Sequence, residues 1–113
     1  MTKKIFIIAG EASGDLIGSK LIKELKKINN SEYEFLGVGG KLMKEQNFNS
    51  IFPLEDLAIM GFVEILPAIP KIISRINSTI KAIEEFAPDI LITIDAPDFC
   101  FRILKKQIGR AHV

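Results

Sequence analysis

The sequence predicts an open α/β fold, in which helices cover a mainly parallel β-sheet. Apolar runs alternate along the chain with segments of helical spacing, which is the order of parallel strands and their crossover helices. Glycine-bearing turns follow the first two runs, at the strand ends where such sheets bind ligands. The 113 residues are 48% hydrophobic, which is enough for one domain with a core of its own.

The composition excludes several classes of function. A net charge of +1 gives no overall attraction to nucleic acid, so we expect no nucleic-acid partner. Cys100 is the only cysteine, which rules out an intrachain disulfide and indicates a reducing cytoplasm. His112 is the only histidine, so neither a Ser-His-Asp triad nor a zinc site can be built, and we expect no metal. No apolar stretch is long enough to span a bilayer.

The first strand is predicted over residues 4–9, and the loop Gly10-Glu11-Ala12-Ser13-Gly14-Asp15 follows it. Free amides and the positive end of the next helix suit an anionic group, such as a phosphate or a sugar nucleotide. The loop matches neither a P-loop nor G-x-G-x-x-G, and its two carboxylates suit sugar hydroxyl or amide groups better than phosphate. The alternative is a plain strand-to-helix turn, with Ser13 as the N-cap and Asp15 in the first turn.

A helix is predicted over residues 16–28, since its apolar positions are spaced by four, four and three. The side that these positions share consists of Ile17, Leu21, Leu25 and Ile28.

The second strand is predicted over residues 33–38, and its end overlaps the glycine-rich turn Gly37-Val38-Gly39-Gly40. A tight turn into a short helix over 41–46 is slightly favoured for these glycines. The alternative is a second part of the ligand rim. A short strand over 49–52 and a connection over 53–57 follow.

An unusually apolar stretch covers residues 59–70 and leads into a helix that ends near Ala87, before Pro88. The core seam of that helix is predicted to be Ile69, Ile72, Ile73, Ile76, Ile80 and Ile83. Not every apolar side chain of this region can face one small sheet, so some are expected to stay exposed and to meet a partner or a membrane. The alternatives are ordinary core and contact with a further domain. The candidate membrane-contact residues are Val63, Ile65, Leu66, Ile69, Ile72 and Ile73.

The fourth strand is predicted over residues 89–94, and its near-continuous apolar run suggests an interior strand buried on both faces. Asp95 follows it, at the same sheet edge as the first loop, where desolvation favours a general base. Helix capping, with Pro97 early in the next helix, is the alternative for Asp95. Asp98 is predicted to be an N-cap, and we also count it as a candidate substrate-binding residue.

Three motifs in this order and spacing resemble the amino-terminal part of bacterial lipid-A-disaccharide synthase. They cover residues 9–15, 60–64 and 94–99, and the turn over 37–40 fits the family's second glycine-bearing loop. The resemblance implies a GT-B glycosyltransferase with two Rossmann-like domains. Residues 1–106 would form a partial amino-terminal, acceptor-side domain, and residues 107–113 an atypical tail. The carboxyl-terminal domain that holds most of the UDP site would be absent.

The family resemblance also implies an activity. An inverting transferase of this kind joins UDP-2,3-diacylglucosamine to 2,3-diacylglucosamine 1-phosphate, giving lipid A disaccharide 1-phosphate and UDP without a cofactor or metal. It would be cytoplasmic and peripheral to the inner membrane. Asp95 would be the base that deprotonates the acceptor's 6-hydroxyl. The substrate-binding residues would be Gly10, Glu11, Ala12, Ser13, Gly14 and Asp98.

We expect the short polypeptide to be catalytically silent alone, because most of the donor site would be missing. Two other classes of function stay open. One is a stand-alone anion- or nucleotide-binding Rossmann-like module. The other is a membrane-surface or partner-binding piece without chemistry.

Overall fold

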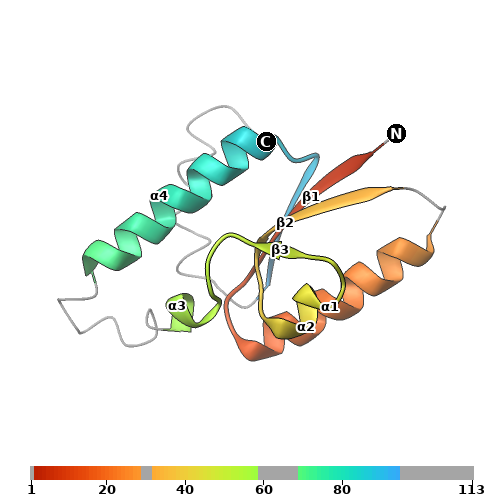
Figure 1. Cartoon of the computed structure of the whole chain (residues 1–113), viewed down its shortest axis with the longest axis horizontal. Helices are drawn as coiled ribbons and strands as arrows, with labels where there is room; N and C mark the ends of the chain where they lie inside the picture. Colours follow the sequence, from red (N-terminus) through yellow and green to blue (C-terminus); the bar gives the residue numbers. More distant parts are fainter. Residues whose placement is uncertain (1, 29–31, 59–68, 95–113) are drawn as a thin grey trace.

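The computed structural model describes residues 2–28, 32–58 and 69–94 of the chain (Figure 1). Over these ranges four parallel strands form one sheet in the order β3-β2-β1-β4. The arrangement confirms the predicted α/β, Rossmann-like fold. The strands are β1 (Lys3–Ala9), β2 (Tyr33–Val38), β3 (Asn49–Ser50) and β4 (Ile90–Ile94). The helices are α1 (Ala12–Lys27), α2 (Lys41–Lys44), α3 (Glu55–Ala58) and α4 (Ile69–Phe86).

Strand β1 is the centre of the sheet, since it pairs with β2 on one side and with β4 on the other. Every side chain from Ile5 to Ala9 is buried. Because side chains alternate along a strand, these residues divide between two cores on opposite faces. Each fully buried isoleucine or phenylalanine of β1 contributes about 1.5–3 kcal/mol to folding.

The two cores have different helical covers, and Figure 1 shows α4 on one face with α1 and α2 on the other. The core under α4 contains Phe6, Ile8, Val38, Phe52, Leu54, Leu57, Ile76, Ile80 and Ile83. The core under α1 and α2 contains Ile5, Ile7, Ala9, Ile22, Phe35, Met43 and Phe48.

Helix α1 packs through a different side from the one its large apolar residues predict. Its buried positions are Gly14, Asp15, Gly18 and Ile22. Ile17 is 51% exposed and Ile28 is 50% exposed, so two of the four apolar residues that share one side of the helix lie outside the core. The reason is close approach: a Cβ on Gly14 would lie 3.1 Å from the Ile94 carbonyl oxygen. A glycine facing the sheet lets the helix lie nearer than a leucine or isoleucine would.

Helix α4 follows the predicted seam in its second half. Ile76, Ile80 and Ile83 are buried, whereas Ile73 is 50% exposed and does not belong to the core. The side chains of Ile69 and Ile72 lie outside the described residues. The helix ends at Phe86, near the predicted boundary, and Ala87 adopts a left-handed conformation with φ of 49°. The Ala87 amide donates to the Ile83 carbonyl at 2.9 Å, which closes the last turn.

Two further predictions need correction. The connection expected over 53–57 contains the short helix α3. Strand β4 is not buried on both faces, since Ile90 is 50% exposed, Thr93 is exposed, and Leu91, Ile92 and Ile94 are only partly buried. Of the described strands only β1 pairs with β4, so β4 forms an edge of the described sheet. None of the described helices combines the length and apolar character needed to cross a bilayer.

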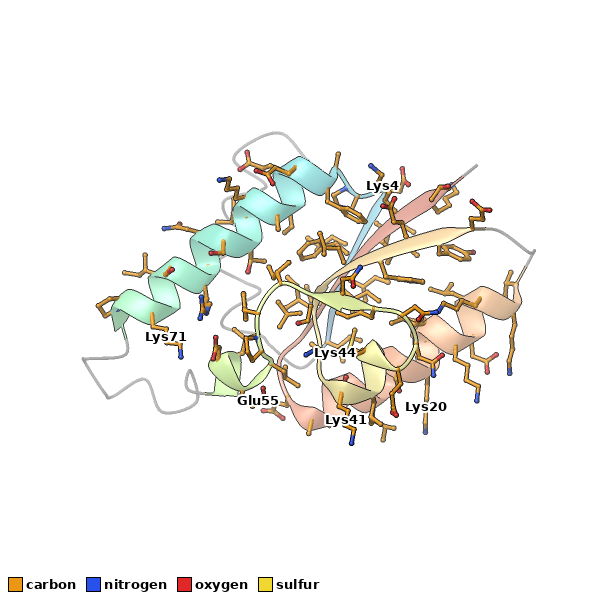
Figure 2. All side chains as sticks on the ribbon, in the orientation of Figure 1. Lys4, Lys20, Lys41, Lys44, Glu55 and Lys71 are labelled. Carbon is orange, nitrogen blue, oxygen red and sulfur yellow. The ribbon has the colours of Figure 1, made fainter. Side chains whose placement is uncertain are left out.

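An ion cluster joins α3 to α4. The Asp56 carboxylate is 2.8 Å from Arg75 Nε and 3.3 Å from Lys71 Nζ, and its side chain is only 13% exposed. Figure 2 shows Lys71 projecting from the first turns of α4 on the side where α3 lies. Burial on its own raises the pKa of the Asp56 carboxyl, but the hydrogen bonds and positive charges of Arg75 and Lys71 outweigh it and lower the pKa.

The lowered pKa of Asp56 predicts a loss of stability in acid. A carboxyl whose pKa is lower in the folded state adds stability above its unfolded value, here close to 3.8, and loses it as the pH falls through the folded value. We expect Asp56→Asn to lower the free energy of unfolding by about 0.5–1 kcal/mol at pH 7, given the exposure of both cations. At a pH below both the folded and the unfolded pKa of Asp56, the free energies of unfolding of the variant and the parent should differ much less.

Urea unfolding at pH 7 and at the lowest pH at which the parent stays folded measures both differences. Glu24→Gln is the control, because Glu24 pairs with Lys27 at 3.4 Å on an exposed helix surface and should change stability little at either pH. An equal effect of Asp56→Asn at the two pH values would contradict the assignment.

The left-handed residue after α4 gives a second prediction. Ala87→Gly should raise the free energy of unfolding by about 0.5–1 kcal/mol, because glycine adopts a positive φ without a steric cost. The same substitution inside the helix, Ala82→Gly, should lower it by about 1 kcal/mol. Chemical denaturation of both variants tests the pair, and a destabilised Ala87→Gly protein would refute the cap.

Candidate functional site

The carboxyl ends of β1, β2 and β4 meet at one edge of the sheet. In the parallel register Ala9 lies opposite Ile94, and Ile8 lies opposite Val38. The Gly10 amide donates to the Ile94 carbonyl oxygen at 3.0 Å, so the carboxyl ends of β1 and β4 lie side by side. Asp95 and Asp98 lie outside the described residues, and their roles stay predictions.

The first loop presents three exposed residues between two buried glycines. Gly10 and Gly14 are buried, and Glu11, Ala12 and Ser13 face solvent. Helix α1 begins at Ala12, with Glu11 in an extended conformation as its N-cap residue, so the prediction of Ser13 as N-cap is wrong. The helix starts early because Gly14 must already be helical where it passes the end of β4.

Asp15 has a role that the sequence does not signal. Its side chain is 6% exposed and reaches from α1 to the start of α2. Oδ1 accepts hydrogen bonds from the amides of Gly40 at 2.9 Å and Met43 at 3.0 Å, and Oδ2 accepts one from Leu42 at 3.0 Å. The prediction that Asp15 suits sugar hydroxyl groups is therefore wrong, because backbone donors of the protein already occupy both oxygens.

Ser50 holds the same loop from the other side. Its Oγ accepts a hydrogen bond from the Gly39 amide at 3.1 Å and donates one to the Phe52 carbonyl at 2.7 Å. The Gly39 and Gly40 amides of the second loop thus donate their hydrogen bonds to Ser50 and Asp15, respectively. Such bonding favours the tight-turn interpretation of the second glycine-rich segment over a ligand rim made of its amides.

Gly40 is required by the contact with Asp15. A Cβ on Gly40 would lie 2.6 Å from Asp15 Oδ2, closer than any side chain could approach without displacing the carboxylate. Gly40 is also the N-cap residue of α2, a position where a serine or aspartate normally supplies the capping oxygen. Asp15 supplies that oxygen from another helix.

Two exposed lysines near this edge point outward. Lys20 on α1 and Lys41 on α2 are exposed and extend away from the sheet in Figure 2. The exposed Glu11 carboxylate and the first turn of α1 are therefore the polar features of the first loop. The Glu11 side chain makes no capping hydrogen bond to α1, which leaves the positive end of the helix without that acceptor.

The candidate membrane-contact residues are described only in small part. Val63, Ile65 and Leu66 lie outside the described residues, as do the side chains of Ile69 and Ile72. Ile73 is half-exposed on α4, as an apolar contact with a partner or a membrane would require.

Comparison with known proteins gives a consistent result. A family model described as lipid-A-disaccharide synthetase matches residues 5–110. The chain is similar to a lipid-A-disaccharide synthase of Rhodospirillum centenum, with 50% identity over 107 residues that cover 95% of this chain and 26% of the relative. It is also similar to one from Granulibacter bethesdensis, at 48% identity over 89% of this chain and 25% of the relative.

A probable mitochondrial lipid-A-disaccharide synthase of Arabidopsis thaliana is 46% identical over 95% of this chain and 23% of its own length. The chain therefore spans about a quarter of the length of these curated relatives. The family model covers nearly all of it, including both glycine-bearing loops and the end of β4. The protein belongs to the lipid-A-disaccharide synthetase family.

Proposed function

We propose that this chain supplies the acceptor side of an inverting GT-B glycosyltransferase that forms the lipid A disaccharide. The single observation that carries the proposal is the hydrogen bond between Gly10 and Ile94. It joins the ends of the two strands whose following segments carry the family motifs. A sugar resting at that edge would contact the first loop on one side and the segment after β4 on the other.

In the proposed reaction the acceptor is 2,3-diacylglucosamine 1-phosphate and the donor is UDP-2,3-diacylglucosamine. Asp95 accepts the proton of the acceptor's 6-hydroxyl as that oxygen forms a bond to the anomeric carbon of the donor. The bond from this carbon to the UDP oxygen breaks, and UDP leaves with the electron pair. A single displacement of this kind inverts the anomeric configuration. A positioned general base typically contributes 10²–10⁴-fold, or about 3–5 kcal/mol of barrier.

The first loop suits a sugar in the proposed site. The exposed Glu11 carboxylate can accept hydrogen bonds from hydroxyl or amide groups, and Ala12 and Ser13 keep the rim low enough for a sugar ring to approach. The positive end of α1 points to the same edge. Gly14, Ala12, Ser13, Gly10, Glu11 and Asp98 are the proposed substrate-binding residues.

The proposed enzyme works at the cytoplasmic face of the inner membrane, since both substrates carry acyl chains. Val63, Ile65 and Leu66, together with Ile69, Ile72 and Ile73 of α4, would enter the lipid surface. Two or three inserted apolar side chains, at roughly 1.5–3 kcal/mol each, suffice for reversible surface binding.

The catalytic proposal is tested in an extended enzyme. Residues 1–106 are joined to the part of the Rhodospirillum centenum relative that follows its matched region, and disaccharide formation is assayed. Asp95→Ala should lower kcat by 10²–10⁴-fold, because the acceptor hydroxyl then lacks its base. Asp89→Ala is the matched control. The Asp89 carboxylate accepts a hydrogen bond from the Lys4 amide at 2.8 Å, and it lies at the opposite end of β4 from the proposed chemistry. Normal turnover after Asp95→Ala would refute the assigned base.

The membrane proposal is tested by co-sedimentation of the chain with anionic phospholipid vesicles. Changing Val63, Ile65, Leu66 and Ile69 together to serine should weaken binding at least tenfold, because apolar burial in the lipid is lost. The control changes Ile28 and Ile90 to serine, since both are half-exposed and lie at the opposite end of the sheet from the first loop. Equal binding by the two variants would contradict the patch.

A further inference from the structure

We propose that Asp15 is a positioning residue of the sugar site, which holds the second loop against the first. The inference rests on the proposed function, because it assigns Asp15 to the acceptor edge of that site. Asp15 itself is buried and touches no ligand position: it acts through Gly40 and the amides that begin α2.

The carboxylate completes a helix that cannot cap itself. The first amides of any helix lack acceptors within the helix, and the N-cap residue of α2 is a glycine without a side chain. Asp15 accepts hydrogen bonds from three of these amides at 2.9–3.0 Å, although it precedes them by 25 to 28 residues in the chain. Hydrogen bonds from amides to a charged, buried carboxylate are among the stronger ones in proteins. The contact therefore fixes the position of the second loop rather than merely filling space.

The same residue is held rigidly at its other end. Asp15 follows Gly14, where an added Cβ would lie 3.1 Å from the Ile94 carbonyl oxygen and 3.4 Å from Ala9 Cβ, so Gly14 fits closely against the ends of β4 and β1. The position of the second loop relative to the end of β4 is thus set through Asp15 and Gly14. The same contact holds the first loop, which ends in Asp15 and carries most of the proposed substrate-binding residues. A displacement of about 1 Å in a site can cost 10²-fold in rate, so loss of the contact would affect the acceptor through the first loop.

A purely structural role makes a different prediction. Loss of a buried hydrogen-bonded group would then lower stability and reduce the active fraction, which lowers the apparent kcat and leaves the KM values of donor and acceptor unchanged. A positioning role changes acceptor kinetics selectively, because most of the proposed donor site lies in the other half of the enzyme.

The test uses Asp15→Asn in the extended enzyme, since the amide group of asparagine cannot accept at both of its ends. The acceptor kcat/KM should fall about 10²-fold, in part through a rise in the acceptor KM, and the donor KM should stay within about twofold. Gly40→Ala should act similarly, because its Cβ would displace the carboxylate. The two substitutions should be non-additive, since they break one contact. Ile80→Val, a core change under α4, is the control for lost stability.

Hydrogen exchange at the amides of Gly40, Leu42 and Met43 in the same proteins gives a second readout. Exchange should accelerate at least tenfold in Asp15→Asn and stay unchanged in Ile80→Val, because only the first removes the acceptor of these amides. Unchanged exchange in Asp15→Asn, or parallel losses for donor and acceptor that match Ile80→Val, would overturn the inference alone. An extended parent enzyme that forms no disaccharide would overturn the proposed function, and this inference with it.

Discussion

The enclosure of β1 is the constraint on which the rest of the structure depends. The strand is hydrogen-bonded on both edges and covered by helices on both faces, so its direction and register determine where every neighbouring element ends. Parallel pairing with β2 and β4 brings three strand ends to one edge. The candidate site is a consequence of that pairing, because the first loop and the end of β4 meet there through Gly10 and Ile94.

The strands were largely predictable from the sequence. Apolar runs over 4–9, 33–38 and 89–94 match β1, β2 and β4 to within a residue, since buried parallel strands need near-continuous hydrophobic stretches. The end of α4 was also predictable, because Pro88 cannot continue a helix and disfavours helical geometry in the residue before it. Isoleucine spacing located the inner face of α4 at Ile76, Ile80 and Ile83.

The packing of α1 and the role of Asp15 were not predictable in the same way. A prediction from hydrophobic spacing assumes that large apolar side chains face the core. Helix α1 instead approaches the sheet through Gly14, and the contact is possible because glycine has no side chain. Asp15 has the same local signature as an ordinary first-turn acid. Its partners on α2 become neighbours only once β1 and β2 have paired, so no local pattern reveals them. Asp95, the proposed base, is still known from its motif alone.

The link through Asp15 has a consequence for protein engineering. The turn after β1 and the turn after β2 depend on each other. The first carries the Asp15 carboxylate, which accepts the hydrogen bonds, and the second carries the backbone amides that donate them. Recombination between relatives with a crossover point between residues 15 and 40 would separate the Asp15 carboxylate from the amides that it binds. Libraries meant to alter sugar preference should therefore transplant both turns at once and place their junctions outside them.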